Sequence, residues 1–70
     1  MDYKEIEIKE DFIKLDSALK FSGLVPTGGI AKMVNLDGLV SVNGEICLQR
    51  GKKLRKGDRV LYEGEGFEIK

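Results

Sequence analysis

The chain has 70 residues, 41% of them apolar, and its 12 basic and 12 acidic side chains leave no formal net charge at neutral pH. This composition is typical of one small globular domain and excludes a disordered or low-complexity chain. The sequence has no tract of about 18 apolar residues that could cross a membrane, and no charged-then-apolar N-terminus of the kind that directs secretion. The single cysteine excludes an internal disulfide, which fits a cytoplasmic protein.

The N-terminal part predicts a short strand followed by a helix. Apolar and charged residues alternate over residues 6–8, as in a half-buried strand, and residues 12–13 continue in extended form. A narrow apolar stripe then favours a helix over residues 15–22, with Gly23 ending it. The stripe consists of Leu15, Ala18, Leu19 and Ser22.

A second helix is predicted after the turn Pro26-Thr27-Gly28-Gly29. Thr27 is of a type that caps a helix N-terminus, and Gly38 would end the helix. The helical pattern places four apolar residues in the core and two polar ones in solvent. The predicted core residues are Ile30, Ala31, Met33 and Val34, and the predicted solvent residues are Lys32 and Asn35.

The C-terminal half predicts several short strands. Val40 and Val42 alternate with polar residues, and Asn43-Gly44 is the strongest short signal for a two-residue hairpin turn. Further strands are predicted at residues 45–48, 59–62 and 67–69, with turns at 56–58 and 64–66. The fold class expected from this order is α+β, with two helices packed on a small, mostly antiparallel sheet.

Charge is unevenly distributed along the chain. Residues 1–13 hold five acidic and two basic side chains, and residues 60–70 hold three acidic and one basic. The middle is basic, with a cluster of six cations: Arg50, Lys52, Lys53, Arg55, Lys56 and Arg59. Such asymmetry favours an anionic partner on one face, phosphates of a nucleic acid above all. The alternatives are internal pairing with the acidic ends, or a surface that only keeps the protein soluble.

Nothing in the sequence indicates an enzyme, a metal site or a cofactor. The chain has no histidine to act as a general base, and Cys47 between two apolar residues is predicted to be a small core residue. No cluster of metal ligands is present, and the glycine spacing does not match a nucleotide-binding loop. Thr27-Gly28-Gly29 could instead hold a phosphate at a helix N-terminus, or be an ordinary cap. Phe21 lies off the apolar stripe and either packs on a neighbouring segment or stacks on a base.

Four stretches together resemble the S4 (S-four) RNA-binding domain. They are Lys14-Leu15-Asp16 with Leu19 and Gly23, then Thr27-Gly28, the run from Val34 to Gly44, and Arg55 to Val60. The resemblance covers about residues 12–62 and is strongest to short stand-alone bacterial members, which share the pattern of Thr27 to Lys32. One position departs from the pattern: the family's arginine is Gly28 here, so backbone amides would replace a side-chain phosphate contact.

The resemblance implies the family fold (the alpha-L motif) and a non-enzymatic RNA-binding module. Its partner would be structured RNA, ribosomal or tRNA-like, and the ribosome itself, rather than DNA or a membrane. The expected RNA-binding residues are Lys14, Lys20, Thr27, Gly28, Gly29, Lys32, Asn43, Arg50, Lys52, Lys53, Arg55 and Lys56. Two alternatives stay open. One is a protein-interaction adaptor that binds an acidic partner through the same cluster of basic residues, and the other is a small-anion sensor built on Thr27-Gly28-Gly29.

Overall fold

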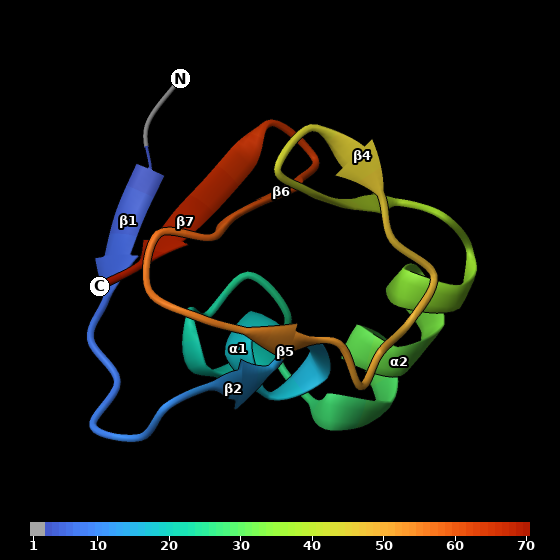
Figure 1. The fold of residues 1–70 in the computed structure, drawn as a ribbon. Helices are drawn as coiled ribbons and strands as arrows, with labels where there is room; N and C mark the ends of the chain where they lie inside the picture. The colour runs from blue at the N-terminus through green and yellow to red at the C-terminus, as the bar shows by residue number, and fades with distance from the viewer. Residues whose placement is uncertain (1–2) are drawn as a thin grey trace.

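The computed structural model describes residues 3–70 and has the expected α+β architecture, with two helices beside a sheet of short strands (Figure 1). The elements in chain order are β1 (Tyr3–Ile6), β2 (Ile13–Lys14), α1 (Leu15–Phe21), α2 (Gly28–Leu36), β3 (Val40–Val42), β4 (Glu45–Ile46), β5 (Lys53–Leu54), β6 (Arg59–Tyr62) and β7 (Glu65–Ile69). Neither helix of this described part is long and apolar enough to span a membrane.

The main sheet has the strand order β1-β7-β6-β3-β4. All its neighbouring strands are antiparallel except β1 and β7, which run parallel, so the mostly antiparallel prediction is confirmed. The strands β2 and β5 form a separate antiparallel ladder at the start of α1 (Figure 1). This small ladder joins the basic segment after β4 to the helical layer.

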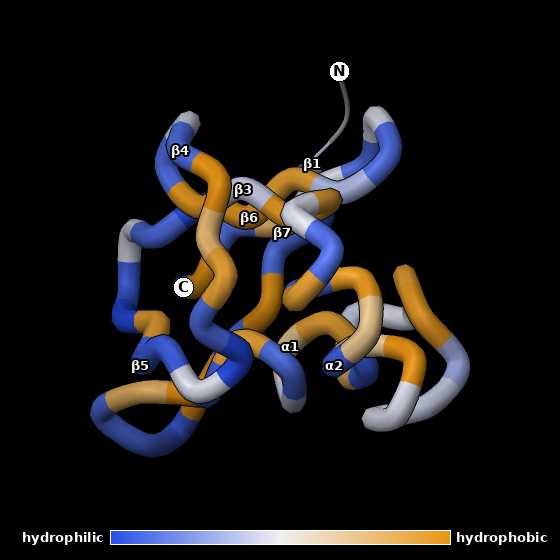
Figure 2. The backbone as a smooth tube through the Cα atoms, turned by 90° about the vertical axis from the view of Figure 1, so that its right-hand side faces the viewer, coloured by the Kyte–Doolittle hydropathy of each residue, from blue (hydrophilic) through white to orange (hydrophobic). Residues whose placement is uncertain are grey.

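One hydrophobic core holds the helices against the sheet. It contains 13 buried apolar residues from both helices, both sheets and the loops between them. Leu15 and Leu19 of α1 and Phe67 of β7 are among the largest side chains that are fully buried. Each such side chain contributes roughly 1.5–3 kcal/mol by leaving water, so this core carries most of the stability of the domain. Figure 2 shows that hydrophobic and hydrophilic residues alternate along the backbone of both the strands and the helices.

Both helices begin and end near the predicted residues. Gly23 and Gly38, with φ of 83° and 75°, take the left-handed conformation that follows a helix C-terminus. The backbone N–H of Ile30 donates to Thr27 Oγ1 at 3.2 Å, so Thr27 caps α2 as expected.

The prediction for the buried face of α2 is partly wrong. Asn35, expected in solvent, is fully buried, whereas Met33, expected in the core, is 61% exposed, and Ile30 is also exposed. The buried stripe is instead Ala31, Val34 and Asn35. The reason is a hydrogen bond over a long sequence distance: Asn35 Nδ2 donates to the carbonyl of Cys47 at 2.6 Å. A buried amide is tolerated when it is bonded, and here it ties α2 to the segment after β4.

The Asn43-Gly44 hairpin is confirmed, with φ of 52° and 88° and Val42 opposite Glu45. The predicted last turn is wrong. It lies at Glu63-Gly64, with φ of 51° and 79°, and the strand β7 already includes Gly66. A Cβ on Gly66 would lie 2.6 Å from the carbonyl oxygen of Val60. The glycine is therefore there for close packing between strands and not for a turn.

Candidate nucleic-acid interface

The β2–β5 ladder places two lysines directly opposite each other. Lys14 pairs with Lys53, and both side chains are exposed, while the adjacent pair Ile13 and Leu54 faces the protein interior. Like charges at directly opposite positions of a ladder destabilise the strand pair. An anion bound between the two ammonium groups would remove this repulsion.

The N-terminus of α1 fixes the backbone of the basic loop, which we define as residues 50–56. The N–H of Leu15 donates to the carbonyl of Lys52 at 2.9 Å, and the N–H of Asp16 donates to the carbonyl of Arg50 at 3.0 Å. The first amides of a helix have no partner within the helix, so the loop satisfies two of them. The cations of the loop are thereby held beside Lys14 on a fixed backbone.

The C-terminal end of the loop is a tight turn organised by Asp58. Its Oδ2 accepts a hydrogen bond from the backbone N–H of Arg55 at 2.8 Å, and Gly57 has a φ of 96°. The only acid in the segment 50–59 thus bonds to backbone and to the amide of Asn43. It forms no ion pair with the side chains of Arg55 or Lys56, which are exposed.

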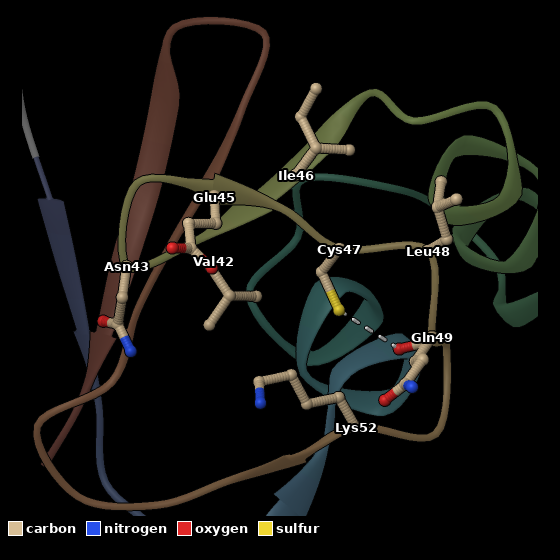
Figure 3. A pocket seen from close by; sticks show the side chains of 8 residues that line it. All are labelled: Val42, Asn43, Glu45, Ile46, Cys47, Leu48, Gln49 and Lys52. Carbon is tan, nitrogen blue, oxygen red and sulfur yellow. Dashed lines mark hydrogen bonds between the residues drawn. The ribbon is translucent and has the colours of Figure 1, made fainter.

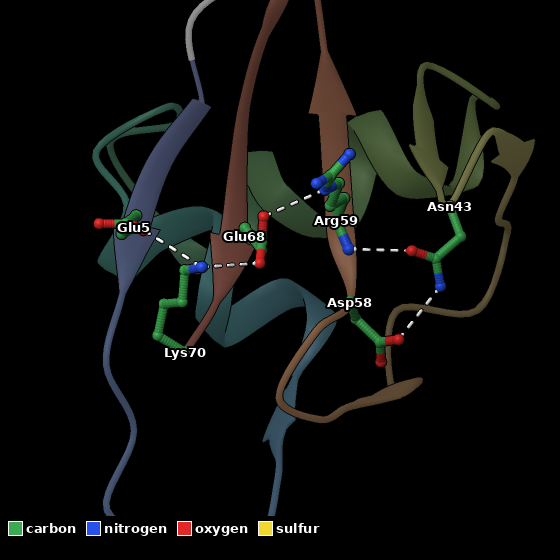
Figure 4. A network of polar contacts seen from close by, with 6 residues as sticks. All are labelled: Glu5, Asn43, Asp58, Arg59, Glu68 and Lys70. Carbon is green, nitrogen blue, oxygen red and sulfur yellow. Dashed lines mark hydrogen bonds and ion pairs between the residues drawn. The ribbon is translucent and has the colours of Figure 1, made fainter.

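The nitrogen and the oxygen of the Asn43 side-chain amide are both hydrogen-bonded to other residues of the protein, although Asn43 is exposed (Figure 4). Its Nδ2 donates to Asp58 Oδ1 at 3.1 Å, and its Oδ1 accepts from the N–H of Arg59 at 3.0 Å. Its own backbone N–H donates to the carbonyl of Arg59 at 2.8 Å. This residue therefore has a structural function, because it joins the β3–β4 turn to the start of β6. Its expected contact with RNA stays a prediction.

Within residues 3–70, the acidic side chains near the two ends of the chain neutralise only one cation of the cluster. Arg59 Nε lies 3.0 Å from Glu68 Oε1, and Lys70 Nζ lies 3.0 Å from Glu68 and 3.3 Å from Glu5 (Figure 4). These neighbours lower the pKa of Glu68 and raise that of Lys70. Among residues 3–70, no ion pair involves the five cations of the basic loop. Internal ion pairing therefore neutralises Arg59, whereas the cations of the basic loop stay available to an anion.

The other predicted residues lie apart from the loop. Lys20 is exposed in the last turn of α1, and Lys32 is exposed on α2. At Thr27-Gly28-Gly29 the threonine hydroxyl is used as the cap, and nothing lies within 4 Å of a Cβ built on Gly28. Within the described part of the chain, no hydrogen bond or ion pair links these residues to the basic loop. The two packed helices connect these residues to the loop.

Two features were not predicted from the sequence. Lys53 Nζ lies 4.9 Å from the ring centroid of Phe12, a cation–π contact that holds the lysine. The second is an open hollow of about 550 Å³ between the β3–β4 hairpin and the loop, lined in part by Gln49, Cys47 and Lys52 (Figure 3). Cys47, expected in the core, is half-buried and forms a wall of this hollow. Phe21 is 69% exposed.

Comparison with known proteins identifies the family of the chain. The sequence profile of the family described as S4 domain matches residues 6–70. A protein of Bacillus subtilis (strain 168), described as "probable ribosome maturation protein RlbA", is 39% identical over 65 residues, which cover 91% of this chain and 92% of that protein. Both matches include the β2–β5 ladder, both helices and the basic loop. The chain therefore belongs to the S4 domain family.

Proposed function

We propose that this protein is a non-enzymatic RNA-binding module that docks on structured RNA, ribosomal or ribosome-associated. The observation that carries the proposal is the pair of exposed lysines Lys14 and Lys53, which lie opposite each other across the β2–β5 ladder and form no ion pair within residues 3–70. Membership of the S4 domain family and a relative described as a ribosome maturation protein support the same conclusion. The runner-up is an acidic protein partner on the same basic loop.

The basic loop would bind phosphates as a preorganised set of charges. Its backbone is bonded to the N-terminus of α1 at one end and is closed by Asp58 at the other. A loop that is already ordered loses less conformational entropy on binding than a mobile one. Lys14, Arg50, Lys52 and Lys53 would contact the phosphates, and Arg55 and Lys56 would extend the contact. Such contacts read the shape of the backbone and not the base sequence.

The start of α2 would take a separate phosphate. The N–H groups of Gly28 and Gly29 lie at the N-terminus of a helix, where the dipole favours an anion, and the open space at Gly28 allows a close approach. Lys20 and Lys32 would flank the same RNA from the two helices. If about four to six phosphates are contacted in total, the logarithm of affinity should fall with that of salt with a slope of roughly −3 to −5.

The test is a salt series of binding to ribosomal RNA fragments. The wild type is compared with the triple variant Lys52→Glu, Lys53→Glu, Arg55→Glu, whose folding is checked by circular dichroism. Arg55→Glu and Lys4→Glu form a matched pair, because each reverses one exposed charge and Lys4 lies on the edge strand β1. We expect steep salt dependence, loss of binding in the triple variant and weaker binding for Arg55→Glu than for Lys4→Glu.

A slope near zero, or a folded triple variant that binds RNA as the wild type does, would refute this proposal. The acidic protein partner would then become the leading candidate. It predicts that unrelated structured RNAs fail to compete for the basic loop.

A further inference from the structure

The hollow beside the basic loop has a mixed polar and apolar wall. Its volume is about 550 Å³, within the range of roughly 300–1,000 Å³ that is typical of small-ligand sites. The segment after the hairpin turn contributes alternate side chains: Glu45 and Cys47 point toward the hollow, whereas Ile46 and Leu48 point away (Figure 3). The latter two approach Gly38, with side-chain atoms 3.7 Å from a Cβ built there.

The polar groups of the hollow suit the edge of a nucleobase. The amide of Gln49 offers both a donor and an acceptor, which is the combination that base edges require, whereas the amide of Asn43 is already bonded to Asp58 and Arg59. Val42 and the thiol of Cys47 supply apolar wall, and the thiol donates only a long bond of 3.7 Å to the carbonyl of Gln49. The ammonium group of Lys52 points into the same space (Figure 3).

The position of the hollow connects it to the phosphate-binding residues. The carbonyl of Lys52 accepts a hydrogen bond from the N–H of Leu15, and the next residue, Lys53, pairs with Lys14 on the ladder. The proposed phosphate site at Lys14 and Lys53 is therefore next in the sequence to Lys52, which lines the hollow. A base within a continuous duplex is stacked and paired, so only an unpaired nucleotide could turn into the hollow.

We propose that the hollow receives one unpaired nucleobase of the bound RNA. This inference rests on the proposed function and makes it more specific: the protein prefers RNA with a bulged or looped nucleotide to a continuous duplex. Phosphate contacts supply most of the affinity, and Gln49 and Lys52 hold the base. Recognition of unpaired nucleotides by base-edge hydrogen bonds is the usual source of selectivity in RNA binding.

Cys47 gives a direct test, because it is the only cysteine in the chain and lies in the wall of the hollow. The rate of its alkylation by iodoacetamide is measured for the free protein, with a saturating RNA hairpin that carries a one-nucleotide bulge, and with a fully paired hairpin of equal length. We expect the bulged RNA to slow alkylation several-fold and the paired RNA to leave it nearly unchanged. The bulged RNA should also bind at least about fivefold tighter.

Matched variants separate the hollow from the phosphate contacts. Gln49→Ala alters an exposed side chain and should reduce the preference for bulged RNA while affinity for paired RNA stays the same. Lys56→Ala should weaken both RNAs equally. Equal protection of Cys47 by both RNAs would overturn the inference and leave the proposed function in place. Absence of binding to either RNA at low salt would instead overturn the proposed function.

Discussion

At the scale of single residues, Lys14 occupies a structurally unfavourable position that suits the proposed contact with RNA. It faces Lys53 across the ladder and also precedes the first residue of α1, where the helix dipole disfavours a cation. No hydrogen bond or ion pair among residues 3–70 compensates for either effect at its ammonium group. A residue selected for stability alone would be acidic or neutral here.

Lys14→Glu should therefore stabilise the protein and weaken RNA binding. A glutamate would attract Lys53 and favour the helix N-terminus, with a combined gain of about 0.5–1.5 kcal/mol in the free energy of unfolding. Thermal unfolding and RNA titration of the same samples measure both effects. Lys14→Gln is the control that removes repulsion without adding attraction, so its gain should be smaller. Lower stability together with unchanged RNA affinity would contradict this account of Lys14.

Asn35 is a residue whose burial could not be predicted from the sequence pattern. Asparagine is polar, and the helical pattern places Asn35 on the solvent side of α2, so an exposed side chain is expected. The side chain is nevertheless fully buried, and its Nδ2 donates to the carbonyl of Cys47. Its Oδ1 has no partner among the described atoms. The bond spans twelve residues, and a helical pattern contains no information about such a partner. The prediction that Met33 is in the core is wrong for the same reason, because the buried face of α2 includes Asn35 and not Met33.

At the scale of elements, the turns show which local signals are decisive. Asn43-Gly44 was predicted correctly, because both residues tolerate positive φ and the flanking alternation is clear. The turn at Glu63-Gly64 was displaced in the prediction, since two glycines flank Glu65 and either could have formed the turn. Only the packing of β6 against β7, where Gly66 touches Val60, assigns the roles of the two glycines. The basic loop was found from charge, but its bonds to α1 depend on tertiary structure.

Glu63→Asn should stabilise the second hairpin. Glu63 has a φ of 51°, a left-handed conformation that costs a non-glycine residue roughly 1–2 kcal/mol and that asparagine adopts more readily. We expect a gain of up to about 1 kcal/mol, equal to a rise of about 4–8 °C in the melting temperature. Glu45→Asn makes the same chemical change in a strand and should give no gain. Equal shifts in the two variants would show that backbone conformation is not the cause.

At the scale of the whole molecule, zero net charge conceals a separation of charge in space. Two acidic side chains of the ends, Glu5 and Glu68, pair with Arg59 and Lys70 and link β1, β6 and β7 (Figure 4). The cations of the basic loop are left on the side of the β2–β5 ladder. This separation favours the proposed contact of RNA with the side of the molecule that carries the ladder.

This arrangement predicts how stability depends on pH. Lys70 and Arg59 lower the pKa of Glu68 below its ordinary value of 4.5. A carboxylate with a lowered pKa contributes stability above its ordinary pKa, and the contribution is lost as pH falls through the lowered value. Glu68→Gln should therefore be less stable than the wild type at pH 7, and the two should converge as pH falls below about 4.5. Unfolding in denaturant across this range is the measurement.

The control for this prediction is Glu65→Gln, which removes an exposed carboxylate of the same strand that takes part in none of these ion pairs. Its free energy of unfolding should equal that of the wild type at every pH. High salt should also reduce the difference at pH 7, because exposed ion pairs are screened. A constant difference between Glu68→Gln and the wild type from pH 7 to pH 3 would assign the effect to packing. The ion pairs would then not be what fixes the two ends of the chain to the sheet.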